Sequence, residues 1–462
     1  MVTSMRWGMH NLPSQQTAQD QFIMSTLAHQ EYLDGLPAEW GRVRLGDLGS
    51  VYAGSTPRRS ESQYWEGSIP WLTPSEVTGR TSKWIHHTEE QISKSGYEST
   101  SVHLVPKGSL LVTTRATIGE VAIAAMPITT NQGFKNLVLG SGDDPIFYYY
   151  VLRFVADEMK RLASGSTFDE ISKSDFTEIV VPRPSLSEQR RIADVLATVD
   201  AAIQETDEVI AKQEQVKTGL LQDLLTRGLD AQGRLRDPEK EPEAFRETTD
   251  LGKVPAEWDL TTLGEVGIWK SGGTPRRSNP SYWGGETPWL TPKDMKSYRV
   301  ERTTDYVTSE GLSGTKVAPA GSIFVVVRGM ILAHTFPVCV SDRPMAFNQD
   351  VKAVIPSAEI ASEYLGKWMQ AHEGAFLRLV TEATHGTKRF DMSDLYSLSV
   401  AVPPREEQRS IVQRLHSQES RVDQEREYKS KLQCLKTGLM QDLLNGRVRV
   451  PEAKKRVNDV IA

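Results

Sequence analysis

The sequence predicts an α+β protein with two mixed α/β modules in tandem, each followed by one long helix, and the two helices pairing as a coiled coil. Three observations indicate this fold class: a repeat that covers most of the chain, short strand-like and helical runs within each repeat, and a heptad pattern at the end of each repeat. The 462 residues exceed what one ordinary hydrophobic core holds, about 250 to 300 residues. We therefore expect at least two domains.

The composition indicates a globular protein outside the membrane. Hydrophobic residues make up 38% of the chain and charged residues 25%, enough apolar material for packed cores and too much for wholesale disorder. No apolar run approaches the ~20 residues that span a bilayer, and the N-terminal residues lack the order of a secretory signal. A cytoplasmic location follows as the expectation. The two cysteines, Cys339 and Cys434, can build neither a disulfide framework nor a Cys-rich zinc site.

Self-comparison of the chain reveals the repeat. Residues 36–77 align without gaps on residues 254–295, with 21 of 42 positions identical, and residues 187–225 align on 406–444, with 15 of 39 identical. Between these ends, residues 78–163 and 296–383 have diverged. Similar ends around dissimilar middle segments favour a scaffold that presents two different recognition surfaces, because a duplicated enzyme would be expected to repeat its active site. Neutral drift of surface loops is the alternative.

Each module reads as a mixture of strands and helices. Runs rich in Val, Ile and Leu, bounded by Gly, Pro or Asn, predict strands at 109–113, 120–124, 322–327 and 351–355. Apolar residues at three- and four-residue spacing predict helices over 147–162 and 361–380.

The period then changes to a heptad. Apolar residues follow an alternating four-three pattern, with polar Thr206, Gln213 and Lys217 at skipped positions; the predicted coiled-coil residues are Ile192, Leu196, Val199, Ile203, Ile210, Leu220 and Leu224, repeated by Ile411, Leu415, Val422, Leu432, Leu439 and Leu443. Such a seam needs a partner helix, and the nearest is the other copy in the same chain. Two unconnected amphipathic helices are the alternative.

Prolines 182, 184, 403 and 404 mark where the long helices begin. The expected organisation is an unassigned segment at 1–35 with a short helix near 20–33, a first module at 36–184, a central helix at 185–228, an exposed polar linker at 229–253, a second module at 254–404, a C-terminal helix at 405–447 and a tail at 448–462.

Several motifs carry a resemblance to a known family. LPAEW begins the first module, GSTPRR follows at 54–59, TTRATIG lies at 113–119, TNQGF lies at 130–134, and a Glu-Gln-Arg-Arg-Ile run opens the long helix. In this order they closely resemble the specificity subunits of type I restriction-modification systems, over residues 36–447.

The resemblance implies a non-enzymatic reader of double-stranded DNA. Each module would be a target recognition domain for one half of a bipartite site, and the two helices would pair antiparallel to separate the modules. Two methyltransferase subunits and a restriction or translocase subunit would dock on this scaffold. The resemblance implies no cofactor for this chain, because S-adenosylmethionine, ATP and Mg would belong to the partner subunits.

The candidate DNA-binding residues fall into three groups. Paired cations on Gly/Pro loops suit phosphate or partner contact, or form a solvated turn. Arginines at strand exits suit guanine, and Asn-Gln pairs suit adenine edges or loop structure. Short polar clusters suit phosphates. The predicted residues are Arg58, Arg59, Arg276 and Arg277 in the first group, Arg115, Thr117, Arg328, Asn131, Gln132, Asn348, Gln349 and Lys135 in the second, and Ser166, Thr167, Thr387 and Lys388 in the third. The nearby tyrosines and tryptophans, being identical in both modules, are expected in the core.

Enzymatic alternatives find little support. Asn279-Pro280-Ser281-Tyr282 resembles the Asn-Pro-Pro-Tyr type motif of adenine methyltransferases, but no glycine-rich S-adenosylmethionine loop accompanies it. The chain also lacks a phosphate-binding Gly-x-x-x-x-Gly-Lys-Ser/Thr loop. The alternatives to the type I subunit are a specificity subunit whose partner fuses methylation with cleavage, a stand-alone adenine methyltransferase, and a structural coiled-coil adaptor.

Overall fold

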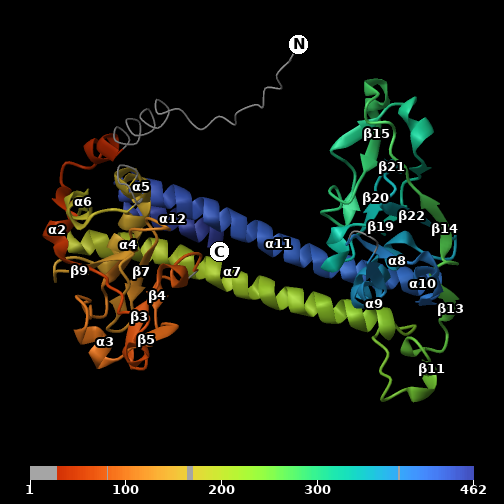
Figure 1. The fold of residues 1–462 in the computed structure, drawn as a ribbon, viewed down its shortest axis with the longest axis horizontal. Coiled ribbons are helices and arrows are strands. Elements are labelled where there is room, and N and C mark those ends of the chain that lie inside the picture. Colours follow the sequence, from red (N-terminus) through yellow and green to blue (C-terminus); the bar gives the residue numbers. More distant parts are fainter. Residues whose placement is uncertain (1–28, 81, 164–169, 383–385, 462) are drawn as a thin grey trace, which may run out of the picture. The chain divides into compact units, whose positions relative to one another are not determined.

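The computed structural model describes residues 29–80, 82–163, 170–382 and 386–461. The chain divides into two compact units (Figure 1). Unit 1 holds the described residues up to Glu208 together with those from Arg426 onward, and unit 2 runs from Val209 to Glu425. Each unit thus contains one module and parts of both long helices.

The module of unit 1 is built on two sheets. A five-stranded sheet has the order β2 (Gly49–Ala53), β9 (Phe134–Leu139), β6 (Leu110–Thr113), β7 (Val121–Ala124) and β4 (Trp84–Ile85). A three-stranded sheet has the order β5 (Glu90–Ile92), β3 (Ile69–Leu72) and β8 (Thr129–Thr130). β1 (Gly41–Arg44) pairs antiparallel with β10 (Val180–Arg183), so the two ends of the module are tied together.

The module of unit 2 repeats this topology. Its five-stranded sheet has the order β14 (Gly267–Ser271), β22 (Val351–Pro356), β19 (Ile323–Val326), β20 (Val338–Ser341) and β16 (Arg299–Val300). The second sheet has the order β17 (Asp305–Val307), β15 (Trp283–Leu290), β21 (Met345–Phe347) and β18 (Val317–Ala318). Three two-stranded pairs complete it: β13 (Asp259–Thr262) with β25 (Ser399–Val402), β11 (Phe245–Thr248) with β12 (Gly252–Pro255), and β23 (Val380–Glu382) with β24 (Lys388–Phe390). The predicted tandem of mixed modules is confirmed.

Three helices of each module correspond in order. Unit 1 contains α2 (Leu45–Leu48), α3 (Lys94–Glu98), α4 (Pro145–Phe154), α5 (Ala156–Ala163) and α6 (Lys173–Glu178); unit 2 contains α8 (Ser362–Ala371), α9 (Glu373–Arg378) and α10 (Met392–Ser397). The helices α4, α5 and α6 in unit 1 correspond to α8, α9 and α10 in unit 2. Short 3₁₀ turns lie at η1 (Ser62–Tyr64), η2 (Pro74–Glu76), η3 (Pro242–Ala244), η4 (Pro280–Tyr282), η5 (Gly311–Gly314) and η6 (Met330–Ala333). The four predicted strands occur within one residue of their expected bounds, whereas each predicted module helix is broken into two.

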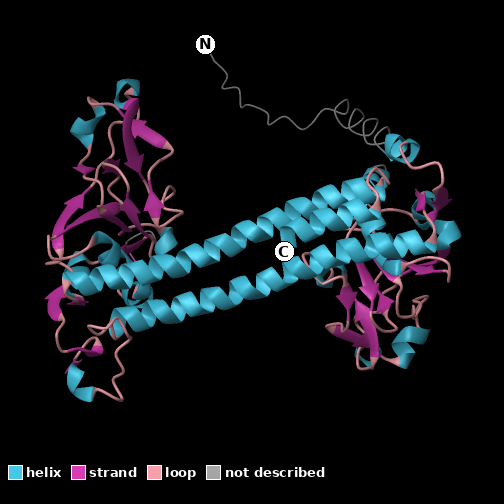
Figure 2. Ribbon diagram, turned by 180° about the vertical axis from the view of Figure 1, so that it is seen from behind, coloured by secondary structure: helices cyan, strands magenta, loops and turns pink. Residues whose placement is uncertain are grey.

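The heptad segments form α7 (Leu186–Thr226) and α11 (Arg405–Leu444), which lie side by side within each unit (Figures 1 and 2). In unit 1, Lys436 pairs with Asp200 at 2.6 Å and Lys429 with Asp207 at 2.5 Å, so ascending numbers in α7 meet descending numbers in α11. The helices are therefore antiparallel. All thirteen predicted seam residues are buried or half-buried. The predicted antiparallel coiled coil is confirmed.

One layer of the helix pair in unit 2 is polar. The side chain of Gln418, 5% exposed, donates to the side-chain oxygen of Gln213 at 2.7 Å. The repeat places Val199 of α7 at the position of Gln418, and Leu432 of α11 at the position of Gln213. The two units therefore differ at equivalent points of the seam.

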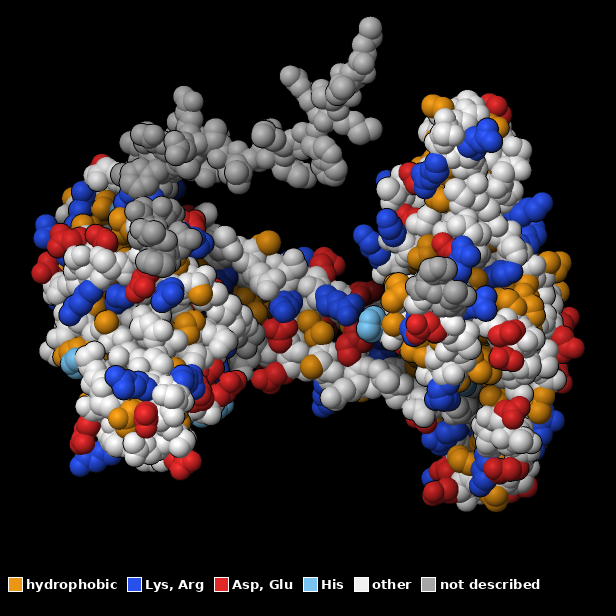
Figure 3. All heavy atoms as spheres, viewed as in Figure 1, with side chains coloured by type: hydrophobic (Ala, Val, Ile, Leu, Met, Phe, Trp, Pro, Cys, Tyr) orange, Lys and Arg blue, Asp and Glu red, His pale blue; other side chains and the backbone are white. Residues whose placement is uncertain are grey.

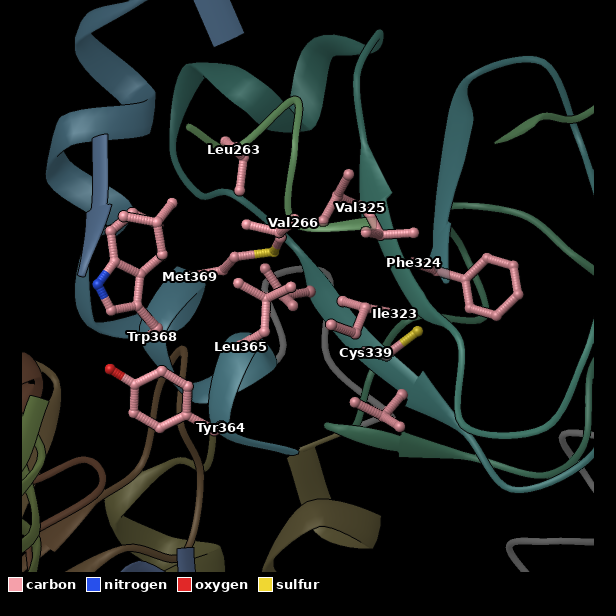
Figure 4. Packing of buried hydrophobic residues seen from close by; sticks show 14 of the residues in the cluster. Leu263, Val266, Ile323, Phe324, Val325, Cys339, Tyr364, Leu365, Trp368 and Met369 are labelled. Atoms are coloured by element: carbon pink, nitrogen blue, oxygen red, sulfur yellow. The ribbon is translucent and has the colours of Figure 1, made fainter. Parts of the chain in front are cut away.

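The main hydrophobic core of each module lies between the five-stranded sheet and one helix, which is α4 in unit 1 and α8 in unit 2. In unit 2, Leu365 and Met369 of α8 lie toward Ile323 and Val325 of β19, and Trp368 of the same helix belongs to the same core cluster (Figure 4). Phe324 points to the opposite side of the sheet, where its ring meets that of Phe347 edge-on at 5.2 Å. Alternate residues of β19 thus serve both faces.

Each long helix ends against the first tryptophan of a module. Gly228 and Gly446 adopt left-handed backbone conformations, with φ of 63° and 66°. A Cβ atom on Gly228 would lie 2.4 Å from the indole of Trp258, and one on Gly446 would lie 3.4 Å from that of Trp40. Glycine therefore suits both positions in backbone conformation and in space.

The connecting segments are more ordered than the sequence indicates. The linker at 229–253 is exposed or half-buried over most of its length, as expected, but Leu229 and Arg236 are only 3% and 8% exposed. The tail contains α12 (Val450–Ile461), whose Ala453 and Val457 belong to the core of unit 1. Of the short helix expected near 20–33, residues 20–28 lie outside the described part of the chain, and residues 29–34 are helical.

Candidate nucleic-acid interface

The two Gly/Pro loops are held in place by the Asn-Gln pairs of the same module. Thr56 donates a hydrogen bond to the side chain of Gln132, and Thr274 donates to that of Gln349 at 2.6 Å. The neighbouring asparagines turn back to their own loops, since Asn131 accepts from the backbone N–H of Gly133 at 2.8 Å.

Asn348 makes the equivalent turn in the second module. Its side-chain oxygen accepts from the backbone N–H of Asp350 at 3.1 Å. Of the two predicted roles of these amide side chains, base contact or loop structure, the geometry therefore supports loop structure.

The second arginine of each pair is engaged within its own module. The Arg59 guanidinium lies 3.8 Å from the ring centre of Trp65 and forms a bidentate pair with Glu90. The hydrogen bonds from Arg59 hold the pKa of the Glu90 carboxyl below its ordinary value.

Arg277 repeats this arrangement. Its guanidinium lies 4.0 Å from the ring centre of Trp283 and 2.8 Å from a carboxylate oxygen of Asp305. Arg59 and Arg277 thus clamp their loops to the module.

The first arginine of each pair is different. Arg58 and Arg276 are exposed, and neither side chain makes a hydrogen bond or ion pair with any residue that the structure describes. Their backbone carbonyls accept from the indole N–H groups of Trp65 and Trp283, at 3.2 and 3.3 Å, which fixes the backbone. A fixed backbone carrying an unpaired guanidinium is suited to a phosphate.

We therefore expect the two arginines of a pair to respond differently to substitution. Arg58→Ala should weaken DNA binding alike for all sequences and reduce the slope of log affinity against log salt by about one unit. Arg59→Ala should instead destabilise the first module by roughly 1 kcal/mol, because it removes the stacking and the carboxylate pair. Filter binding over a salt series, with thermal unfolding of the same variants, distinguishes them. A change in the recognised bases with an unchanged salt slope would place Arg58 on a base edge.

The strand-exit arginines lie on loops with positive φ. Ala116 follows Arg115 with φ of 64°, and Gly329 follows Arg328 with φ of 146°. Among the described residues, Ala116 is the one non-glycine with positive φ. Arg115 is exposed without a side-chain partner in the described structure, whereas Arg328 is paired with Asp350.

The remaining candidates have mixed outcomes. Lys135 was predicted to contact DNA, but its side chain is only 5% exposed and donates to Glu170 at 3.2 Å, so this burial argues against direct contact. Lys388 pairs with Glu382 at 2.7 Å, and Thr387 is half-buried. Thr117 accepts a hydrogen bond from Thr78 at 3.0 Å. Ser166 and Thr167 lie outside the described residues.

The core position expected of the repeated aromatic residues is confirmed for one tryptophan of each module, while Tyr64 and Tyr282 are half-buried. Trp71 and Trp289 are 1% and 2% exposed, and their indole N–H groups donate to the backbone carbonyls of Ser55 and Gly273. Trp65 and Trp283 are half-buried and meet these rings edge-on.

A carboxylate on each long helix, not anticipated from the sequence, anchors the module to the helix. In unit 1, Asp200 of α7 accepts from Tyr150 at 2.5 Å, Lys436 at 2.6 Å and Lys83 at 3.3 Å. Burial alone would raise the pKa of Asp200, but the charge and hydrogen bond of Lys436, the Tyr150 hydroxyl and the charge of Lys83 lower it below its ordinary value.

Unit 2 exchanges the positions of the tyrosine and the lysine near its carboxylate, although the Tyr298 hydroxyl donates to the backbone carbonyl of Glu363 at 3.1 Å. Glu419 of α11, the repeat equivalent of Asp200, pairs with Lys367, and the ring of Tyr298 lies 3.8 Å from the Lys367 ammonium. In unit 1 the tyrosine belongs to α4 and the lysine precedes β4; in unit 2 the lysine belongs to α8 and the tyrosine precedes β16. The sequence feature that could have revealed this anchor is the alignment of Asp200 with Glu419, an acidic residue at the same position of both long helices.

Surface charge does not by itself mark an interface. On the face shown in Figure 3, basic and acidic side chains are interspersed over both modules. In the described part of the chain, no group of three or more His, Cys, Asp or Glu side chains is arranged to hold a metal ion. None of the helices that the structure describes combines the length and apolar character needed to cross a bilayer.

Comparison with known proteins identifies the family. The family model described as the type I restriction modification DNA specificity domain matches the chain twice, at residues 37–214 and 255–433. The chain belongs to this family. It carries two DNA specificity domains, and each match begins at a module's first residues and ends within its long helix.

Three specificity subunits are related over different lengths. The MjaIX subunit of Methanocaldococcus jannaschii is 29% identical over 61% of this chain, the EcoR124I/EcoR124II subunit of Escherichia coli is 38% identical over 34%, and the MjaVIII subunit of M. jannaschii is 21% identical over 90%. These alignments span 64%, 39% and 94% of the relatives' own lengths.

A solved structure shares the fold. A chain from a study of complex assembly and conformational transition of the type I R-M system superposes with a TM-score of 0.57 at 18% identity, covering 89% of this chain and 99% of that one. The family match and the related specificity subunits confirm the expected resemblance, and this solved structure confirms the fold.

Proposed function

We propose that this type I specificity subunit reads a bipartite double-stranded DNA target, with one half-site for each module, and is itself not an enzyme. The observation that carries the proposal is the contrast between the modules. Their five-stranded sheets have the same order of equivalent strands, yet the loops that carry Arg115 and Arg328 differ in sequence and contacts. One framework with two different surfaces suits two different half-sites.

The contrast extends to the residues beneath these loops. Asp350 holds Arg328, while Gly133 stands at the equivalent position of the first module and leaves Arg115 unheld. The residue bridged to each arginine also differs, since Arg115 is opposite Glu170 and Arg328 is opposite Arg389. These differences change the chemistry offered to the base edges.

The absence of catalysis in this chain is part of the proposal. Asn279, the residue of the methyltransferase-like motif, accepts hydrogen bonds from the backbone N–H and hydroxyl of Ser281, at 3.2 and 3.0 Å, and so caps η4. This local structural role accounts for the motif without a target base. Two methyltransferase subunits and a restriction or translocase subunit would dock on the chain, with the helix pair as scaffold and spacer. These partners would carry out methyl transfer and cleavage, and they would bind S-adenosylmethionine, ATP and Mg.

Exchange of one module tests the proposal. Replacing residues 36–184 by the same region of another specificity subunit should change one half of the methylated sequence and leave the other half as it was. Methylome sequencing of a host that carries the variant with its methyltransferase subunit measures both halves. A change in both halves, or in neither, would contradict one half-site per module.

Two controls accompany the exchange. The reciprocal replacement of residues 254–404 should alter the opposite half of the target. The purified chain without a methyltransferase subunit should transfer no methyl group to DNA; methylation by the chain alone, abolished by Asn279→Ala, would overturn the non-enzymatic assignment.

A further inference from the structure

The loop after β19 exposes two large apolar side chains beside an arginine. Met330 is 62% exposed and Ile331 is 38% exposed, although both lie on the short helix η6 directly after Arg328 and Gly329. The next residue, Leu332, is 2% exposed and anchors the loop in the core. The apolar pair is therefore presented to solvent by a loop with an internal anchor.

Backbone contacts hold this loop on both sides. The Gly329 N–H donates to the Lys388 carbonyl at 2.9 Å, and the Phe390 N–H donates to the Val327 carbonyl at 3.1 Å. Arg328 and Arg389 face each other in the resulting antiparallel bridge. The side chain of Arg389 is exposed and makes no hydrogen bond or ion pair in the described part of the chain. The exposed apolar pair thus lies beside cationic groups.

Asp350 orients the Arg328 guanidinium. One carboxylate oxygen accepts from Nε at 2.7 Å and lies 2.6 Å from Nη2, which occupies one edge of the guanidinium. The side chain is 50% exposed, and its contacts with the described residues use Nε and Nη2 and leave Nη1 unbonded. An arginine held in this way has less side-chain freedom to lose when it pairs with the two acceptors of a guanine.

The first module presents a different surface at the same place. Its loop continues as Ala116, Thr117 and Ile118, of which Thr117 and Ile118 are half-buried. Thr117 is also tied to Thr78 by a hydrogen bond. At this loop, an exposed pair of large apolar side chains therefore occurs only in the second module. Residues that read one half-site and not the other are expected to differ between the modules in this way.

We propose that Met330 and Ile331 contact a thymine methyl group in the major groove of the second module's half-site, next to a guanine that Arg328 contacts. The proposal rests on the proposed function, because it assumes that this module reads DNA. The thymine methyl is the apolar feature of the major groove, and an apolar side chain beside a guanine-binding arginine matches a thymine adjacent to that guanine. The nearby cations fit the phosphates that flank such a step.

Removal of the methyl group from the DNA tests the contact. The full chain with its methyltransferase subunit is titrated with duplexes in which each thymine of the half-site is replaced in turn by uracil, which lacks only that methyl. We expect one replacement to weaken binding by about three- to tenfold. The same replacement should have no effect on a variant carrying Met330→Ala and Ile331→Ala, because the methyl then has no apolar partner. The binding free energy lost when the variant binds the uracil duplex should equal the loss from the protein substitutions alone or from the uracil replacement alone.

Matched controls separate the outcomes. Ile268→Ala removes a side chain of β14 that is 64% exposed, toward the other end of the same sheet, and should leave the uracil effect intact. If no thymine replacement distinguishes the wild type from the Met330/Ile331 variant, or if the variant loses affinity equally for all sequences, the contact is wrong. A complex that prefers no sequence in either half-site would instead overturn the proposed function.

Discussion

Glu407→Ala should destabilise unit 2 by about 3 to 5 kcal/mol, because it removes the buried counter-charge of Arg236 and leaves that arginine only Glu257, a carboxylate 3.3 Å away that is 76% exposed. Arg236 and Glu407 are 8% and 9% exposed at their side chains, and Nη1 of Arg236 lies 2.6 Å from the carboxylate. The same carboxylate accepts from the Leu229 backbone N–H at 2.7 Å and from the Trp258 indole at 3.2 Å. Its removal would therefore strip three donors of their acceptor at the junction of linker, module and helix.

The repeat supplies a matched control in Glu188, the equivalent residue of α7. Glu188 accepts from the Trp40 indole at 3.2 Å, but its cation, Arg449, is 64% exposed and 3.7 Å away. Glu188→Ala should therefore cost only about 1 kcal/mol. Arg236→Met combined with Glu407→Gln should recover most of the loss from Glu407→Ala, because no buried charge remains.

Hydrogen exchange measured separately for each unit is the appropriate readout, since a chain of two units need not unfold in one step. Faster exchange is expected in unit 2 for Glu407→Ala and little change is expected in unit 1. Equal losses from Glu407→Ala and Glu188→Ala would show that burial of the ion pair does not determine its contribution.

Features that depend on periodicity were predictable from the sequence. The offset of the repeat fixes which strands correspond, and the two main sheets have the same order of equivalent strands. The heptad pattern identified the residues of the helix seam because the apolar side chains form one stripe on an otherwise polar helix, and packing against the other long helix buries that stripe. The tryptophans were assigned to the interior from their identity in both modules, an inference that Trp71 and Trp289 bear out.

Features that depend on a tertiary partner were not predictable. Arg58 and Arg59 are adjacent and equally charged, and only the positions of Trp65 and Glu90 in the fold distinguish a free guanidinium from a clamped one. The burial of Lys135 has the same origin, because its partner Glu170 lies 35 residues away. The break between α4 and α5 falls at Val155, where neither glycine nor proline interrupts the helical pattern.

The anchor at Asp200 depends on pH in a defined direction. The pKa of Asp200 in the folded protein is below its ordinary value, so its ionised form is favoured by folding. The carboxylate therefore contributes stability above the unfolded value of about 4, and this contribution is lost as the pH falls through the folded value. Acidification should weaken the attachment of the first module to α7.

Tyr150→Lys should disrupt the same anchor at neutral pH. The substitution would bring a third ammonium group to a carboxylate that already pairs with Lys83 and Lys436, and only one negative charge would face three positive ones. We expect a loss of about 2 to 4 kcal/mol in unit 1, since these side chains are largely buried. Lys83→Tyr alone should cost less, because Lys436 and Tyr150 would still satisfy Asp200.

The decisive result is the double variant. Lys83→Tyr with Tyr150→Lys puts the tyrosine before the strand and the lysine on the helix, the positions that Tyr298 and Lys367 have in unit 2, where Lys367 pairs with Glu419. The double variant should be more stable than Tyr150→Lys by at least about 1 kcal/mol, a non-additivity expected only of residues that share a partner. Hydrogen exchange in unit 1, compared among the wild type, both single variants and the double variant, measures the coupling. If the two substitutions are merely additive, Asp200 does not join the tyrosine and the lysine into one anchor, and the correspondence with Glu419 is a coincidence of the repeat.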